Sequence, residues 1–181
     1  EWFEEHPDTT VLALETGLYP GGTYFPEADR RAIYNDYFSS AETMFPVPFR
    51  DYSLETKDVV LGRGIGESFK AYPADVLQRE LVVNDVVGGT AVVIVGSPES
   101  QSARVYLREG RSFSPLVEDI SASGVLAVIV DSDGGRWRVR EGSLVSEADP
   151  SMELARVPAH MAFWFGWFQF HQDTELYGGS E

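Results

Sequence analysis

The 181-residue chain contains no cysteine. That absence excludes disulfide bonds, thiolate metal sites, iron–sulfur clusters and cysteine nucleophiles. It does not identify a redox compartment, because proteins of any compartment can lack cysteine. A chain of this length buries roughly 70% of its unfolded surface, so a core can form without covalent cross-links. We therefore expect one domain, or one domain with an arm.

Positive charge is scarce. The chain has 14 Lys and Arg residues against 29 Asp and Glu, for a net charge of −15, and Lys57 and Lys70 are its only lysines. Such a surface repels phosphate backbones, so the sequence argues against a nucleic-acid partner. Hydrophobic residues make up 43% of the chain and aromatic residues 13%, which excludes a disordered acidic segment.

Long apolar runs are also absent. The longest, residues 161–170, is far shorter than the ~20 residues needed to span a bilayer. The first residue is Glu1, and no basic-then-apolar leader precedes the rest of the chain. We therefore expect a soluble segment that is processed, truncated or a fragment.

The first third of the chain is predicted to be an arm. Residues 1–14 are expected to form the end of a helix, a turn at His6-Pro7-Asp8 and a short strand, as the N-terminal arm or the tail of a preceding repeat. Residues 15–57 are expected to form a linker, with one short helix over 28–38 and an extended proline-rich stretch at 45–49.

Residues 58–181 are predicted to form a β-rich domain. Short apolar runs alternate with glycine-rich or polar turns, a pattern typical of antiparallel hairpins. The expected strands are 59–61, 68–72, 81–87, 90–95, 104–107, 113–117, 125–130 and 137–139, with a helical turn at 73–78 and a helix over 159–171. The predicted class is α+β, mainly antiparallel β, as a sandwich or barrel-like sheet with a C-terminal aromatic helix.

One internal repeat stands out. Trp2-Phe3-x-x-His6-x-Asp8-Thr9 matches Trp167-Phe168-x-x-His171-x-Asp173-Thr174, about one domain length further along. This spacing is too long for a solenoid and indicates a tandem protein. In that interpretation the N-terminal residues are the tail of an earlier copy.

Several segments resemble one family. They are Lys70-Ala71-Tyr72-Pro73, Val83-Asn84-Asp85-x-x-Gly88-Gly89-Thr90, Phe163-Trp164-Phe165-Gly166-Trp167 and His171-x-Asp173-Thr174. Together they resemble the domain of unknown function DUF3179, over residues 58–177, and the arm resembles its inter-copy linker. Members of that family are mostly prokaryotic, often carry export or lipoprotein signals, and often contain two copies. The resemblance implies an extracytoplasmic location, periplasmic or at the cell surface, and no known activity.

The sequence departs from that family at one motif. Members typically carry Cys-Pro-x-Cys, which falls here on Ser97-Pro98-Glu99-Ser100, and a histidine that often precedes Asn-Asp is replaced by Glu80. A thiolate binds soft metals and exchanges with disulfides, whereas an unactivated serine hydroxyl does neither. The resemblance therefore implies a scaffold that has lost its site, or a copy that never had one.

Six residues remain binding candidates: Asn84, Asp85, Ser97, Ser100, His171 and Asp173. His171 with Asp173 could be an acid–base pair or ligands, or the histidine could be structural, because the helix dipole favours a histidine at a helix C-terminus. Asn84 and Asp85 could line a pocket or bond to neighbouring backbone. The two serines lack a nucleophile elbow or a Ser-x-x-Lys motif.

Two further motifs are interpreted as turns. The glycines at 62, 64 and 66 do not have the spacing of a dinucleotide-binding fingerprint. Asp131, Asp133 and Gly134 resemble the start of a calcium loop, but Gly142 stands where the closing Glu would be. The sequence contains no complete catalytic set and predicts no metal and no cofactor.

The leading functional hypothesis is a non-catalytic, extracytoplasmic module, an accessory subunit that docks on a larger membrane-associated protein assembly. The expected partner contacts are the aromatic residues Phe45, Phe49, Trp164, Trp167 and Phe168. One alternative is a metal-binding protein or hydrolase that uses the Asp and His candidates. Another is a small-molecule or glycan binding module, which requires Trp137 or Tyr106 to line a cleft.

Overall fold

The structure is a computed structural model, and it describes residues 3, 6–13, 15, 17–19, 25, 29–32, 34–116 and 126–178. The chain divides into two compact units, Glu1–Phe45 and Pro46–Glu181. This division falls before the boundary at 57/58 that the sequence predicts. The first unit holds the short helix α2 (Asn35–Ser39), which overlaps the end of the predicted 28–38 helix; residues 28 and 33 of that prediction lie outside the described part.

The two copies of the sequence repeat form the same turn. In the first, the Thr9 N–H donates to the His6 carbonyl at 3.1 Å, and in the second the Thr174 N–H donates to the His171 carbonyl at 3.2 Å. The His-x-Asp-Thr part of the repeat therefore has the same turn hydrogen bond in both copies.

The described strands all belong to the second unit. In chain order, its elements are β1 (Val59–Ile65), β2 (Ser68–Pro73), α3 (Ala74–Glu80), β3 (Val82–Val87), β4 (Thr90–Gly96), β5 (Ala103–Leu107), β6 (Phe113–Pro115), β7 (Val128–Asp131), β8 (Arg136–Val139), β9 (Ser143–Ser146), β10 (Glu153–Val157), β11 (His160–Phe163), α4 (Trp164–Phe170) and β12 (Glu175–Leu176).

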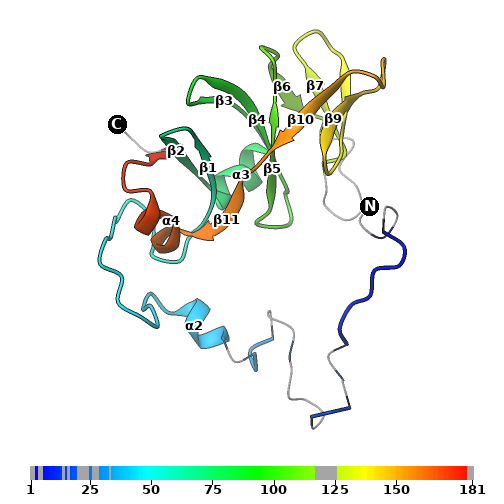
Figure 1. The fold of residues 1–181 in the computed structure, drawn as a ribbon. Helices are drawn as coiled ribbons and strands as arrows, with labels where there is room; N and C mark the ends of the chain where they lie inside the picture. The colour runs from blue at the N-terminus through cyan, green and yellow to red at the C-terminus, as the bar shows by residue number, and fades with distance from the viewer. Residues whose placement is uncertain are drawn as a thin grey trace. The chain divides into compact units, whose positions relative to one another are not determined.

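These strands form two sheets (Figure 1). The four-stranded sheet has the order β11-β1-β2-β12, and the eight-stranded sheet has the order β3-β4-β5-β10-β9-β8-β7-β6. The described strand pairs are antiparallel, apart from the parallel pair of β12 with β2. The larger sheet curls into a nearly closed barrel, so the predicted class of mainly antiparallel, barrel-like sheet with a C-terminal aromatic helix is confirmed.

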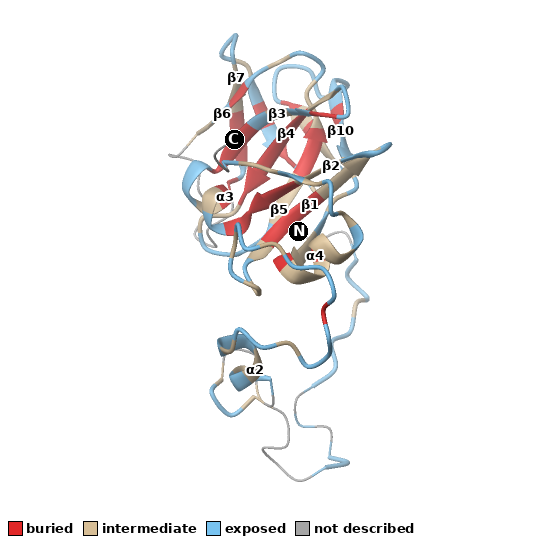
Figure 2. Cartoon of the chain, turned by 90° about the vertical axis from the view of Figure 1, so that its left-hand side faces the viewer, coloured by how far each residue is buried: buried red, intermediate tan, exposed pale blue. Residues whose placement is uncertain are grey.

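Two clusters of the apolar core lie on the two faces of the barrel wall, and a third packs α4 on β1 and β2. Along β4, Val93 and Val95 point into the barrel, whereas Val92 and Ile94 point outward onto β1, β2 and α3. This follows from the period of two along a strand. Residues on both faces of a strand are apolar when both faces are covered. This explains why β4 is apolar at successive positions and does not alternate. Figure 2 shows the buried residues concentrated on the strands of both sheets.

The barrel is closed by a side chain. Its edge strands are β3 and β6, and the Asn84 amide bridges them: Nδ2 donates to the Phe113 carbonyl at 2.7 Å, and Oδ1 accepts from the Phe113 N–H at 2.8 Å. The carboxamide thus takes the place of one backbone pair in the ladder. The sequence left open whether Asn84 lines a pocket or bonds to neighbouring backbone. The structure shows that it bonds to backbone.

The C-terminal prediction needs correction. A helix was expected over 159–171, but its first residues form β11, and α4 begins only at Trp164. The reason is the pairing of β11 with β1, in which Phe163 lies opposite Val59 and His160 opposite Gly62. Strands β9, β10 and β12 were not predicted from the sequence. Residues 117 and 125, at the ends of two predicted strands, lie outside the described part. No described helix is long and apolar enough to cross a membrane.

Candidate functional site

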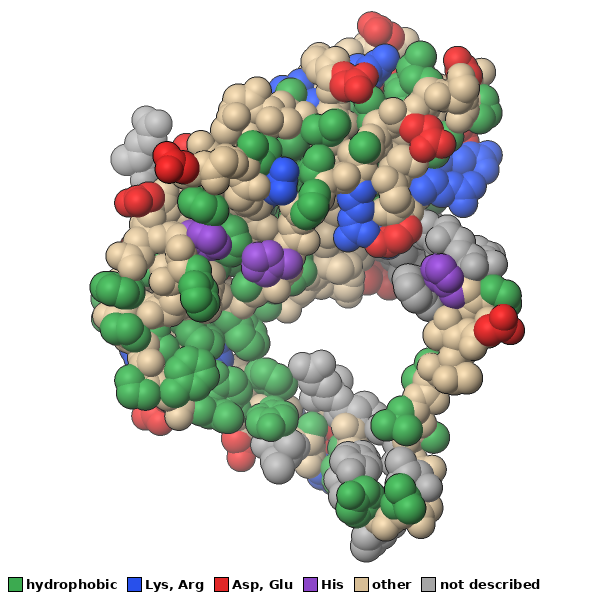
Figure 3. Space-filling view, in the orientation of Figure 1, with side chains coloured by type: hydrophobic (Ala, Val, Ile, Leu, Met, Phe, Trp, Pro, Cys, Tyr) green, Lys and Arg blue, Asp and Glu red, His purple; other side chains and the backbone are tan. Residues whose placement is uncertain are grey.

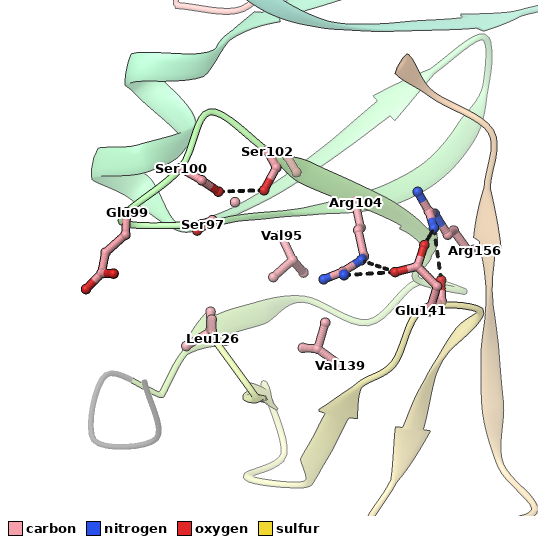
Figure 4. A pocket seen from close by; sticks show the side chains of 12 residues that line it. Val95, Ser97, Glu99, Ser100, Ser102, Arg104, Leu126, Val139, Glu141 and Arg156 are labelled. Carbon is pink, nitrogen blue, oxygen red and sulfur yellow. Dashed lines mark hydrogen bonds and ion pairs between the residues drawn. The ribbon is translucent and has the colours of Figure 1, made fainter. Parts of the chain in front are cut away.

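A pocket of the second unit lies at one end of the barrel, beside the loop of residues 97–102 (Figure 4). Its volume is about 430 Å³. Ser97 and Ser100 both line it, and the loop is closed by a hydrogen bond from the Ser97 N–H to the Ser102 carbonyl at 3.1 Å. Two of the six binding candidates, Ser97 and Ser100, therefore share one site.

Two arginines and a glutamate form the opposite wall of this pocket. Arg104 of β5 contacts Glu141 Oε2 through Nε at 2.9 Å and Nη2 at 2.8 Å. Arg156 of β10 contacts Glu141 Oε1 and donates to the Glu141 carbonyl at 3.2 Å. Sequence reasoning missed these three residues because they are far apart in the chain and form no motif; only the strand order brings them together.

Asn84 and Asp85 point to opposite sides of β3, because neighbours along a strand alternate in direction. Asp85 Oδ2 accepts from the Tyr72 hydroxyl at 2.8 Å and lies 3.0 Å from the Lys70 Nζ. Burial alone would raise the pKa of Asp85, but the bonds from the Val86 N–H, Lys70 and Tyr72 outweigh it and lower that pKa. Asp85 thus links β3 to β2.

The Asp85 network continues to the C-terminal end of the chain. Lys70 also pairs with Glu175 of β12 at 3.3 Å, and the Tyr177 hydroxyl donates to Glu80 Oε2 at 2.9 Å. Burial and the Glu80 carboxylate raise the pKa of Tyr177 to about 12. Burial and Asp85 also raise the pKa of Tyr72. With both phenols held protonated at neutral pH and already donating, this network ties strands together and is not an acid–base pair.

His171, at the end of α4, is packed between aromatic rings. Its ring stacks on Phe69 with centroids 4.1 Å apart and contacts Trp167 at the same distance. Its Nδ1 is buried, and no hydrogen-bond partner lies near it in the described part of the chain. Burial, followed by the charge of His160, lowers the pKa of His171. Asp173 is exposed in the turn after α4.

Acidification is expected to destabilise the fold through His171. The folded-state pKa lies below the unfolded value of about 6.5. The unfolded chain therefore binds the proton more readily, and stability is lost as pH falls from about 6.5 through the lower folded-state pKa. Thermal melting of the wild type at about pH 7.5 and about pH 5.5 measures this loss.

His171→Phe is the matched variant, because phenylalanine keeps the stack on Phe69 and Trp167 without a titratable group. We expect its melting temperature to fall less between the two pH values than that of the wild type. An equal fall in both proteins would show that other groups cause the acid sensitivity.

The two tryptophans of α4 belong to the core. Trp164 and Trp167 are 2% and 3% exposed, and their indole N–H groups donate to the Asp51 carbonyl at 3.2 Å and the Thr174 hydroxyl at 2.9 Å. Phe168 is half-buried against Trp164, with ring centroids 5.5 Å apart. The structure thus places the side chains of these tryptophans in the interior of the second unit.

Other aromatic residues of this region do reach the surface. We call the side chains of Phe49, Tyr52, Phe163, Phe165 and Phe170 the aromatic face. Phe163 and Phe165 stack with centroids 6.0 Å apart, Tyr52 and Phe165 line one small hollow, and Gln169, next to Phe170, bonds to the Phe49 carbonyl. Figure 3 shows hydrophobic side chains gathered over α4. Phe45 belongs to the first unit.

The remaining candidates do not assemble into a metal or catalytic site. Asn84, Asp85 and His171 make separate contacts in the core and between strands, and no group of three His, Asp or Glu side chains in the described part could hold a metal ion. Asp131 accepts the N–H groups of Asp133 and Gly135 and the Trp137 indole, as a turn residue. Tyr106 and Trp137 are core residues and do not line the pocket.

Comparison with known proteins gives a family but no activity. No curated protein and no solved structure matches this chain. The model of the family described as "Protein of unknown function (DUF3179)" matches residues 1–174. This match covers the arm as well as the barrel, and the chain therefore belongs to that family.

Proposed function

We propose that the chain is a non-catalytic module that docks on another protein through its aromatic face. The observation that carries this proposal is that large apolar side chains are exposed on α4 and on the segment before β1, which hydrogen bonds hold together. Phe170 is 83% exposed, Tyr52 86% and Phe49 49%. Exposed apolar surface is costly in water, and aromatic residues are enriched at interaction sites.

The aromatic face is held in place by the core beneath it. The Trp164 N–H donates to the Asp58 carbonyl at 2.8 Å, and the Phe165 N–H donates to the Thr56 carbonyl at 3.1 Å. These bonds join α4 to the segment that precedes β1, so the two parts of the face present a fixed arrangement. A preorganised surface loses little conformational entropy when it binds.

The charge distribution favours a protein over a lipid surface. No residue of α4 is charged, and the chain as a whole carries −15. Helices that bind membrane surfaces normally carry Lys and Arg beside their apolar face. We therefore propose as partner a protein with a complementary apolar surface.

The proposed setting is outside the cytoplasm, as an accessory subunit of a membrane-associated assembly. Its support is the family membership, since related chains often carry export signals. Fractionation of the source cells tests this part separately: the protein is expected in the periplasmic or surface fraction, and recovery with cytoplasmic proteins would contradict it.

The docking proposal predicts that Tyr52→Ser with Phe170→Ser abolishes assembly without unfolding the chain. Both side chains are more than four-fifths exposed, so their truncation should change stability by less than about 0.5 kcal/mol. The native mass of the protein isolated from its source, and its melting temperature, measure the two effects.

Val86→Ser is the matched control, because Val86 is a half-exposed apolar residue of β3 outside the aromatic face. We expect the wild type and this control to be recovered in a defined complex, and the double variant as a free chain. A double variant that assembles like the wild type, or a wild type that is isolated as a free chain, would refute the proposal.

A further inference from the structure

The pocket at the end of the barrel is a second site, separate from the aromatic face. Its apolar part is made by Val95, Leu126 and Val139, which also belong to the barrel core (Figure 4). One polar side is the serine loop, and the other is the group of Arg104, Glu141 and Arg156. At about 430 Å³ the pocket is in the range of small-molecule sites.

The arginine side carries an excess of positive charge. Two guanidinium groups share the single carboxylate of Glu141, and their side chains are only 31% and 35% exposed. A guanidinium has five N–H donors, and Glu141 takes two from Arg104. Figure 4 shows the Arg104 guanidinium reaching into the pocket, and Glu99 belongs to the serine side of the pocket lining.

The chain as a whole carries a net charge of −15. The surrounding acidic surface repels anions at long range, so an anion is retained here only through short-range, geometrically matched contacts. A guanidinium provides such contacts to a carboxylate, because its planar pair of N–H groups matches the two oxygens.

The serine side offers uncharged hydrogen-bonding groups. Ser97, Ser100 and Ser102 line the pocket, and the hydroxyls of Ser100 and Ser102 lie 2.7 Å apart. A hydroxyl both donates and accepts, so this loop suits ligand hydroxyls. Between the two polar sides, the apolar residues can contact the carbon skeleton of a ligand.

We infer that the pocket binds a hydroxylated organic carboxylate about the size of one sugar ring. The carboxylate lies against Arg104 and Arg156, the hydroxyls face the serine loop, and the ring lies on Val95, Leu126 and Val139. No chemical step is involved. The inference does not depend on docking through the aromatic face.

Titration calorimetry with D-glucuronate tests the inference, with D-glucose as the uncharged control and inorganic phosphate as the anion without a carbon skeleton. We expect saturable binding of glucuronate that is at least about tenfold tighter than that of glucose or phosphate. No saturable binding of glucuronate up to about 10 mM would overturn the inference. Binding of glucose or phosphate as tight as that of glucuronate would overturn it as well.

Two variants locate the binding. Arg104→Gln should weaken glucuronate binding at least about tenfold, because it removes a charged donor. Arg138→Gln should leave it unchanged, because Arg138 pairs with Glu147 outside the pocket. Equal effects of the two changes would refute the site.

Ser100→Leu covers the case in which Arg104→Gln fails to fold. Ser100 is exposed on its loop, so leucine is tolerated by the fold but removes a hydroxyl and narrows the pocket. We expect weaker glucuronate binding at an unchanged melting temperature. Wild-type affinity in this variant would contradict the proposed placement of the ligand.

Discussion

Gly62→Ala should destabilise the second unit by about 3 kcal/mol or more. A Cβ at this position would lie 2.2 Å from two ring carbons of Trp167, far inside van der Waals contact. Neither partner can move easily. Gly62 is paired with Ala71 on one side and His160 on the other, and the Trp167 ring is held by Thr174, Phe69 and His171.

Chemical denaturation measures this loss, and Gly142→Ala is the control. A Cβ at Gly142 meets nothing within 4 Å, and that change should be nearly neutral. Adding Trp167→Phe to Gly62→Ala should recover part of the stability by making room for the methyl group. If Gly62→Ala had the same denaturant midpoint as the wild type, Trp167 of α4 would not pack against Gly62 of β1 as described.

Asn84→Ala should open the barrel between β3 and β6, at a cost of about 2 kcal/mol. The variant leaves the N–H and the carbonyl of Phe113 without the Asn84 amide, and Phe113 is only 3% exposed. A backbone group that loses its partner in a buried setting costs more than the average net hydrogen bond.

Hydrogen exchange gives the local readout for Asn84→Ala. We expect the Phe113 amide to exchange faster, while the Val93 amide in the centre of the barrel wall changes only by the global loss of stability. Val86→Ala, two residues along the same strand, should leave the Phe113 amide unchanged. If the Phe113 amide exchanged as slowly in the Asn84 variant as in the wild type, the Asn84 side chain would not close the barrel.

The hairpins could be predicted from the sequence because their signals are local. Gly88 and Gly89 have φ values of 54° and 77°, which glycine adopts without strain, and they connect β3 to β4 as expected. Strand β10 could not be predicted so easily. It pairs with β5, which is distant in sequence, and its partly exposed residues form no apolar run.

The candidate site was predictable in part. The serine loop was identified through the family resemblance, but the two arginines that complete the pocket come from different strands and share no spacing rule. Asn84 and Asp85 were recognised as a polar pair. Asn84 closes the barrel and Asp85 contacts Tyr72 and Lys70, because the two side chains point to opposite sides of the strand. A side chain's partner across a fold is set by topology, which residue patterns do not encode directly.

The most direct test of docking is photocrosslinking from the aromatic face in the source cells. A photoreactive phenylalanine analogue at position 170 should give one discrete crosslinked polypeptide, and Tyr52→Ser should reduce its yield. The same analogue at position 86 should not give that product. Absence of a discrete product at position 170, or the same product from both positions, would contradict the proposal that this face binds a specific protein.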